Sequence, residues 1–128
     1  MSRSRRSPAA RVALRPLTAS TYEIVRRADG VVVGEVECRA DELAEGGLTF
    51  ESVEIEAGQR GWGYGSEAVQ LLEAEGKAER FLARVDVTNG LGLYFWLRLG
   101  YRPVRPDEAP ASPRLGIISM VRVAEPRT

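Results

Sequence analysis

The chain of 128 residues is long enough for one domain with a hydrophobic core and leaves no room for a second. Its 18 basic and 18 acidic residues cancel, which argues against a nucleic-acid partner. One cysteine and no histidine exclude an internal disulfide framework and Ser-His or Cys-His nucleophile pairs, predict no metal site, and indicate a reducing, cytoplasmic location.

Residues 1–10 are basic and serine-rich, and no apolar run follows them. We expect a disordered tail here and not a signal peptide; a basic arm that touches nucleic acid is the alternative. No stretch approaches the roughly 20 apolar residues of a membrane span, so no membrane partner is expected. Seventeen of the 18 basic residues are arginine, which indicates a G/C-rich, bacterial genome.

Four extended segments open the predicted domain, which covers residues 11–128. They are residues 11–17, 22–27, 31–38 and 48–57. The connection through Asp29-Gly30 is typical of a β-hairpin, and a polar connector with one helical turn is expected at 41–47. We expect Cys38 to pack as a small apolar side chain, with a reactive thiol as the alternative.

A glycine-rich loop follows the fourth strand and leads into a helix predicted at residues 66–78. The loop reads Arg60-Gly61-Trp62-Gly63-Tyr64-Gly65-Ser66. Without side chains at alternate positions, backbone amides can approach a ligand, and the start of a helix attracts anions. The loop therefore predicts a phosphate or pyrophosphate site. It lacks the Gly-Lys-Ser/Thr ending of a P-loop and the glycine spacing of a dinucleotide fingerprint, which argues against a nucleotide-binding module.

The second half of the chain alternates between extended and helical patterns. A strand at 81–87 precedes a helix that Asn89 caps and Gly100 ends, and extended segments at 101–104 and 115–123 flank a proline-rich loop at 107–113. The helical spacing of the first helix marks one face with Ala68, Leu71, Leu72 and Glu75, with Val69 beside it. The element order β-β-β-β-α-β-α-β-β predicts a mixed sheet with helices packed on it, in one α/β domain.

Two motifs in this order resemble the GNAT superfamily of acyl-CoA-dependent N-acetyltransferases. The first runs from Val53 to Gly65 and fits a strand followed by the signature Arg/Gln-x-x-Gly-x-Gly/Ala, with Arg60, Gly63 and Gly65 as its members. The second, residues 85–89 followed by 95–101, is similar to the family's strand-Asn-helix segment. The resemblance covers about residues 20 to 123 and implies a GNAT-like sheet whose fourth and fifth strands splay apart around the thioester.

The resemblance implies transfer of an acetyl group from acetyl-CoA to the amine of a small molecule or protein, by direct attack on the thioester. The backbone of Val53 to Ile55 would pair with the pantetheine arm, and Asn89 would hydrogen-bond that arm from the far side. The N–H groups of Gly61 through Ser66 would hold the pyrophosphate, and Arg60 would open the loop. A thioester is already activated, so neither histidine nor metal is needed.

Two aromatic residues of the loop have two interpretations. The rings of Trp62 and Tyr64 would either cover the cofactor or pack on the loop itself.

Departures from the family pattern leave the chemical step open. Trp96 stands four residues before Gly100, where the family commonly has a tyrosine that protonates the thiolate. An indole cannot supply that proton, so we expect Trp96 to pack against the pantetheine or in the core. Glu51 is the nearest carboxylate for a general base; the alternatives are a solvated surface carboxylate and deprotonation through water. A non-catalytic acyl-CoA-binding or protein-interaction domain is therefore the alternative function.

The connection between the first two strands is short. About four residues, Thr18 to Thr21, join them, where relatives usually insert two helices that build much of the acceptor pocket. We expect an acceptor side that is open or that a second copy completes in a homodimer, and the acceptor itself is not predicted.

Overall fold

The computed structural model describes residues 10–41, 47–75, 78–105 and 115–124. The tail predicted at 1–10, apart from Ala10, lies outside these residues, as do most of the 41–47 connector and the loop at 107–113. By their internal contacts the described residues belong to two compact units. The first unit lies within residues 1–38 and 52–77, and the second within residues 39–51 and 78–128.

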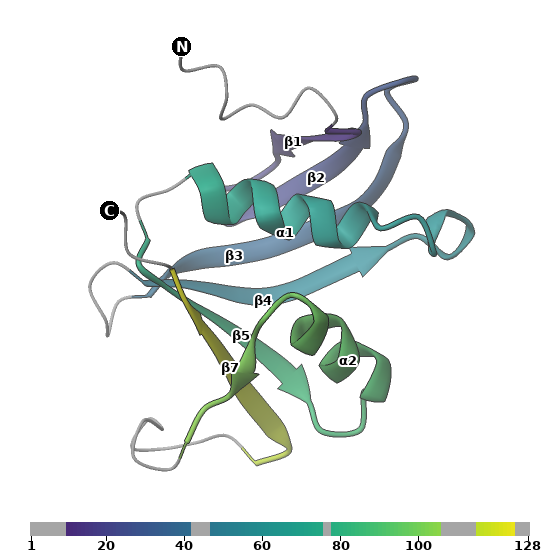
Figure 1. The fold of residues 1–128 in the computed structure, drawn as a ribbon. Coiled ribbons are helices and arrows are strands. Elements are labelled where there is room, and N and C mark those ends of the chain that lie inside the picture. The colour runs from purple at the N-terminus through teal and green to yellow at the C-terminus, as the bar shows by residue number, and fades with distance from the viewer. Residues whose placement is uncertain (1–9, 42–46, 76–77, 106–114, 125–128) are drawn as a thin grey trace. The chain divides into compact units, whose positions relative to one another are not determined.

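The order of elements confirms the prediction, with one short 3-10 helix (η2) in addition. The strands hydrogen-bond in the order β1-β2-β3-β4-β5-β7-β6, so the sheet is mixed and the class is α/β (Figure 1). The elements are β1 (Val12–Pro16), β2 (Thr21–Arg26), β3 (Val32–Asp41), β4 (Gly47–Ile55), η2 (Ala57–Gln59), α1 (Tyr64–Glu75), β5 (Arg80–Asp86), α2 (Gly90–Arg98), β6 (Arg102–Pro103) and β7 (Ile117–Val123).

The first unit is built on an antiparallel meander of β1, β2 and β3. The turn between β1 and β2 is closed by the N–H of Leu17, which donates to the carbonyl of Thr21, and this confirms the short connection. The turn at Asp29-Gly30 confirms the predicted hairpin. Helix α1 packs on β1 and β2 (Figure 1). The buried apolar side chains of this unit include Val12, Ile24, Val33, Val36, Ala68, Val69 and Leu72.

The packed face of α1 differs in part from the predicted one. Its buried stripe is Gly65, Ala68, Val69 and Leu72, the i, i+3, i+4, i+7 spacing of one helix face. Leu71 is half-buried and Glu75 is exposed, so only Ala68 and Leu72 of the face marked by the helical spacing belong to this stripe, together with the neighbouring Val69. Helix α1 starts at Tyr64, two residues before the predicted start, so Tyr64 and Gly65 are also buried residues of the helix.

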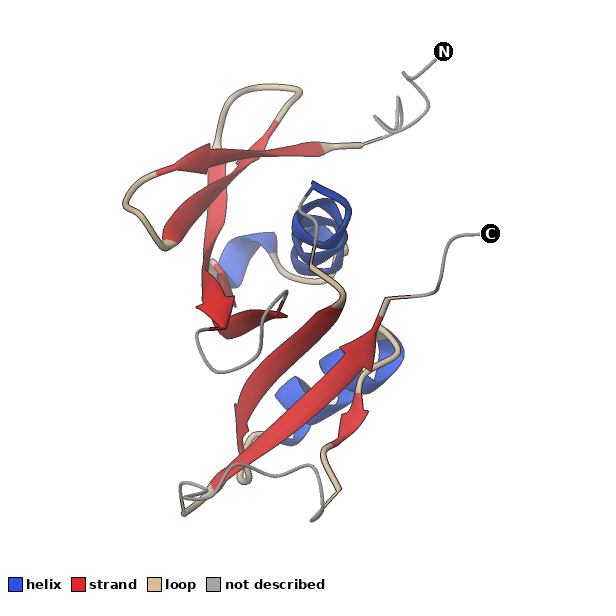
Figure 2. Ribbon diagram, turned by 90° about the vertical axis from the view of Figure 1, so that its left-hand side faces the viewer, coloured by secondary structure: helices blue, strands red, loops and turns tan. Residues whose placement is uncertain are grey.

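The second unit centres on β5. The strand pairs in parallel with β4 over residues 47–50 and antiparallel with β7 over its whole length, while the short β6 pairs with β7. Helix α2 packs on β5 (Figure 2). An aromatic core of Phe50, Phe81, Trp96 and Tyr101 is buried here. The parallel pairing covers only four residues of β4, although β4 itself continues to Ile55.

Gly34 brings two strands of the first unit unusually close together. A Cβ placed there would lie 2.3 Å from the carbonyl oxygen of Glu54 and 2.9 Å from Cδ1 of Ile55. No real Cβ comes so close to a backbone oxygen, so β3 and the end of β4 would have to separate.

We therefore expect Gly34→Ala to lower the free energy of unfolding by roughly 1–3 kcal/mol, the range for forcing an extra group into a packed interior. Gly58→Ala is the matched control, because a Cβ there meets nothing within 4 Å. Urea unfolding followed by circular dichroism measures both variants. Equal stability of the two would contradict the close approach.

Cys38 confirms the prediction of a packed thiol. Its side chain in β3 is 4% exposed, and burial, with Glu75 and Glu37 nearby as smaller causes, raises its pKa to about 11. The thiolate is therefore scarce at neutral pH in the folded chain.

We expect a thiol reagent at pH 8 to modify Cys38 far more slowly in the native than in the unfolded protein.

A raised folded pKa keeps the thiol protonated in the folded state, so the stability linked to it is present below about pH 9 and lost as the pH rises through about 11. Unfolding curves across this range measure the slope. Cys38→Ala should lose that part of the slope, and an identical slope would contradict the assignment.

Candidate functional site

The glycine loop of the first unit connects η2 to α1. Gly61 and Gly63 have φ of +89° and +82°, in the left-handed region that side chains disfavour. Helix α1 begins at Tyr64, so Gly65 and Ser66 lie in its first turn and not in the loop, which corrects the predicted helix start.

The start of α1 has no side-chain cap of its own. Gly63 directly precedes the helix, and its carbonyl accepts the N–H of Glu67 at 3.1 Å. A serine or aspartate at Gly63 would accept the N–H groups of Gly65 or Ser66, but glycine has no side chain to do so. These N–H groups have no intrahelical acceptor, and the helix dipole favours an anion beside them. The junction is thus chemically suited to phosphate.

The structure brings Arg60 and Ile55 together across η2. The Nε of Arg60 donates to the carbonyl of Ile55 at 2.8 Å, while its side chain stays exposed at the mouth of the loop. That carbonyl is therefore engaged within the chain, whereas Val53 lies half-buried in the stretch of β4 beyond its described pairing with β5.

The two aromatic residues of the loop differ in how far their side chains are buried. Tyr64 is 7% exposed and the guanidinium carbon of Arg11 lies 5.1 Å from its ring centre, so this ring packs at the base of the loop. Trp62 is 61% exposed, so its indole is accessible to a ligand. Packing on the loop therefore holds for Tyr64, and contact of Trp62 with a cofactor stays a prediction.

Two arginines brace the loop, and sequence reasoning missed both. Arg11 bonds the carboxylate of Glu67 and the carbonyl of Trp62, whereas Arg26 donates to Oε1 of Gln59 at 2.7 Å. Hydrogen bonds with Asp29, and then with Tyr64, hold the pKa of Arg26 above its ordinary value. Glu67 and Trp62 lie 56 and 51 positions from Arg11, and Gln59 lies 33 positions from Arg26, so no local motif predicts these three contacts.

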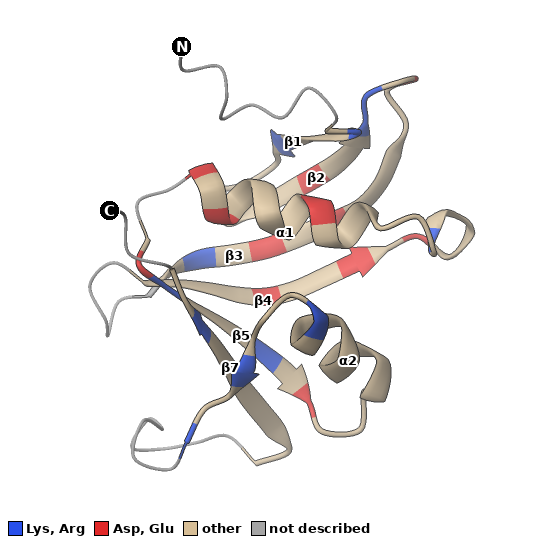
Figure 3. Cartoon of the chain, in the orientation of Figure 1, with Lys and Arg blue, Asp and Glu red and all other residues tan. Residues whose placement is uncertain are grey.

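The charged residues of α1 are all glutamates. Glu67 lies in the first turn, and Figure 3 shows acidic positions toward both ends of the helix. The sequence of α1 contains no lysine or arginine. The positive charge that pairs with the carboxylate of Glu67 therefore comes from another segment of the first unit, at Arg11.

Asn89, in the second unit, caps α2 as predicted. Its Oδ1 accepts the N–H of Gly92 at 2.8 Å, which leaves Nδ2 as the group that can donate to a ligand. The preceding turn is held by Asp86, whose carboxylate accepts from the hydroxyl and N–H of Thr88. These two hydrogen bonds lower the pKa of Asp86.

Trp96 lies in the core of the second unit. It is 6% exposed, and its ring centre is 4.8 Å from that of Tyr101, 5.0 Å from Phe95 and 5.4 Å from Phe50. Core packing thus accounts for the indole, while its contact with pantetheine stays a prediction. Tyr94 is exposed, and the guanidinium carbon of Arg98 lies 5.7 Å from its ring centre.

Glu51 is ion-paired in the second unit. Its Oε2 lies 3.7 Å from the Nε of Arg39 and 3.7 Å from the Nε of Arg84. An incoming ammonium or amine would have to compete with these two guanidinium groups, so the role of general base stays a prediction.

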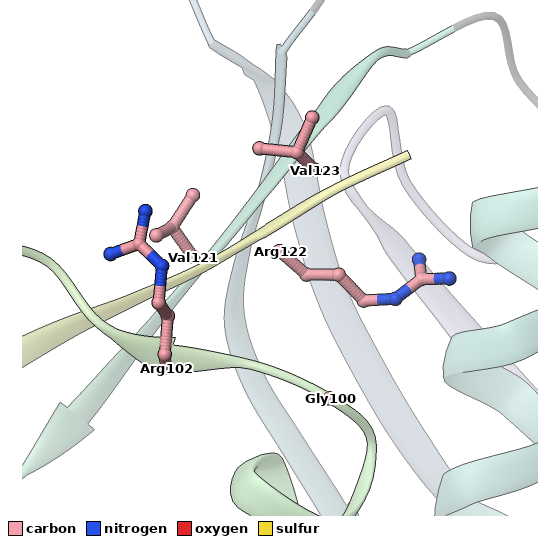
Figure 4. A pocket seen from close by; sticks show the side chains of 5 residues that line it. All are labelled: Gly100, Arg102, Val121, Arg122 and Val123. Atoms are coloured by element: carbon pink, nitrogen blue, oxygen red, sulfur yellow. The ribbon is translucent and has the colours of Figure 1, made fainter. Parts of the chain in front are cut away.

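A hollow of about 410 Å³ in the second unit is lined by none of the predicted site residues. Its lining is Gly100, Arg102, Val121, Arg122 and Val123, and Figure 4 shows the two guanidinium groups pointing away from each other. Across the residues that the structure describes, no group of three His, Cys, Asp or Glu side chains could hold a metal ion. In the same residues, no helix is both long and apolar enough to cross a membrane.

Comparison with solved structures shows the GNAT fold. An acetyltransferase from Thermus thermophilus matches with a TM-score of 0.67 at 18% identity, over 84% of this chain and 67% of that one. A GCN5-related N-acetyltransferase from Kribbella flavida matches with a TM-score of 0.61 at 23% identity, over 81% and 67%. A Bacillus subtilis acetyltransferase in complex with CoA matches with a TM-score of 0.66 at 10% identity, over 90% and 99%.

Comparison of the sequence with models of known families finds no match, and comparison with curated proteins finds none either. The likeness therefore rests on the fold, and the resemblance to GNAT enzymes predicted from the two motifs is confirmed at that level.

We expect Asn89→Ala to lower the free energy of unfolding by about 1 kcal/mol, because it removes the acceptor for the Gly92 N–H. Asn89→Asp keeps a side-chain oxygen that can accept this N–H and should retain the stability. Urea unfolding of the two variants measures this difference. Equal losses would contradict a capping role for the side chain.

Proposed function

We propose that this chain, which has the GNAT fold, binds acetyl-CoA and transfers its acetyl group to an amine. The observation that carries the proposal is the uncapped start of α1 behind Gly63, in a fold whose matched structures include complexes with CoA. The proposed domain covers residues 11–128 of a cytoplasmic, bacterial protein. The acceptor is a small molecule or a protein amine.

The pyrophosphate would lie against the N–H groups of Gly61 through Ser66. Negative charge there is favoured by the helix dipole and by the exposed guanidinium of Arg60. Ser66 lies half-buried in the first turn of α1. Its hydroxyl is a further hydrogen-bond donor close to these amides.

The pantetheine arm would take the place of a strand partner beside β4. Backbone groups of Val53 and its neighbours beyond the described β4–β5 pairing could bond the amides of the arm. Asn89 would donate to the arm through Nδ2, since its Oδ1 is engaged in the cap. Trp96 would be a packing contact near the arm.

The chemical step is attack of an uncharged amine nitrogen on the thioester carbonyl carbon. The C–N bond forms, the C–S bond breaks, the thiolate of CoA takes up a proton and the amine nitrogen loses one. Alignment and polarisation of the carbonyl supply most of the acceleration when the acyl group is already activated. Glu51 would accept the amine proton directly or through water, and water would protonate the thiolate.

A second candidate is a domain that binds acyl-CoA or a protein partner without turnover. The burial of Trp96 among aromatic rings and the pairing of Glu51 with two arginines favour it, since neither offers a free acid or base. The short β1–β2 connection also provides little wall for an acceptor pocket. In a homodimer, a second copy would supply that wall.

Calorimetry with acetyl-CoA, followed by acetyl transfer to a panel of amines, tests the proposal. Binding together with transfer would support the enzyme, and binding without transfer to any amine would favour the second candidate. Absence of binding would refute both CoA-dependent functions.

We expect Gly63→Ala to weaken acetyl-CoA binding at least tenfold. The added Cβ would be strained at this positive φ and would lie 3.4 Å from Nη2 of Arg11, so the loop would shift where the pyrophosphate binds. Gly30→Ala is the matched control, with φ of +76° in a hairpin turn and open space around it. It should cost a similar amount of stability, about 1 kcal/mol, and leave the affinity unchanged. Equal affinities for both variants would contradict the assignment of the loop.

A further inference from the structure

We propose that Arg11 is a positioning residue that holds the glycine loop in its anion-binding shape; this inference rests on the proposed function. Arg11 contacts the chain on both sides of Gly63, in the loop and in the first turn of α1. Its backbone N–H donates to Oε2 of Glu67, and its Nε donates to Oε1 at 3.0 Å. Its Nη2 donates to the carbonyl of Trp62 at 2.8 Å.

Arg11 is itself fixed to the sheet. It directly precedes β1, and its carbonyl accepts the N–H of Arg27 at 2.8 Å, beside the last pair of the β1–β2 ladder. The guanidinium also lies over the ring of Tyr64, which is buried at the start of α1. The loop is therefore tied to the β1–β2 hairpin through one side chain, within a single compact unit.

The bond to Trp62 sets the direction of a peptide group. In a trans peptide the C=O and the following N–H point in opposite directions. Because Arg11 holds the carbonyl of Trp62, the N–H of Gly63 points away from Arg11 and does not turn back to it. Both glycines that flank Trp62 have positive φ, so without this bond the peptide could rotate with little steric resistance.

The bond to Glu67 removes a conflict of charge. A carboxylate in the first turn stabilises the helix but repels a pyrophosphate that binds the same turn. Glu67 is 18% exposed and pairs with Arg11, so the guanidinium neutralises it without any basic residue from α1. Arg11 thereby allows the same helix start to carry a glutamate and to accept an anion.

The test is the dissociation constant of CoA, measured by calorimetry for Arg11→Ala, Arg11→Lys and Arg15→Ala, with urea unfolding as a parallel readout of stability. Arg15 is the matched control, because it forms an Arg–Glu ion pair on the same hairpin, with its Nε and Nη2 both donating to Oε1 of Glu23. We expect Arg11→Ala to weaken CoA binding at least tenfold and Arg15→Ala to leave it unchanged. Arg11→Lys keeps the charge but lacks the guanidinium fork, so its loss should be intermediate.

Adding Glu67→Gln to Arg11→Ala should recover part of the lost affinity, because the uncompensated carboxylate is then gone. No recovery would overturn the charge part of the inference. CoA binding by Arg11→Ala within twofold of the wild type would overturn the inference while the proposed function stands. If Arg11→Ala fails to fold, wild-type affinity in Arg11→Lys would overturn it equally. Failure of the wild type to bind CoA would instead refute the proposed function.

Discussion

The start of helix α1 imposes the constraint on which the proposed site depends. A helix leaves its first N–H groups without intrahelical acceptors, and a polar side chain at the preceding residue usually satisfies one of them. Here the preceding residue is Gly63, which offers none. The donors are consequently left for solvent or for an anionic ligand, and the rest of the first unit holds the loop that presents them.

The two α-helices in the described part of the chain differ in how their first N–H groups are treated. Helix α2 is capped by Asn89 within its own sequence and needs no ligand. Helix α1 has bracing contacts from Arg11 and Arg26, which fix the loop without covering the first-turn amides with a cap. Stability at α2 comes from a local bond. At α1 the uncapped amides leave room for binding.

The proposed binding and the proposed catalysis are supported by different observations. The proposed binding of a CoA ester rests on the glycine loop and on the uncapped start of α1, which together suit an anion. The chemical step has no equivalent cluster. Trp96 is committed to aromatic packing and Glu51 to two ion pairs, so the proposed transfer depends mainly on alignment of an activated thioester.

Local patterns in the sequence determined the elements and the loop. The Asp29-Gly30 hairpin, the Asn89 cap and the end of α2 before Gly100 were predictable because each depends on residues within a few positions. Tertiary structure alone decided that Arg11 binds Glu67, that Glu51 pairs with two arginines, and that Trp96 packs against Phe50 and Tyr101. It also showed that α1 begins at Tyr64, two residues before the predicted start. These outcomes depend on packing between distant segments, and such contacts leave no periodicity or spacing in the sequence itself.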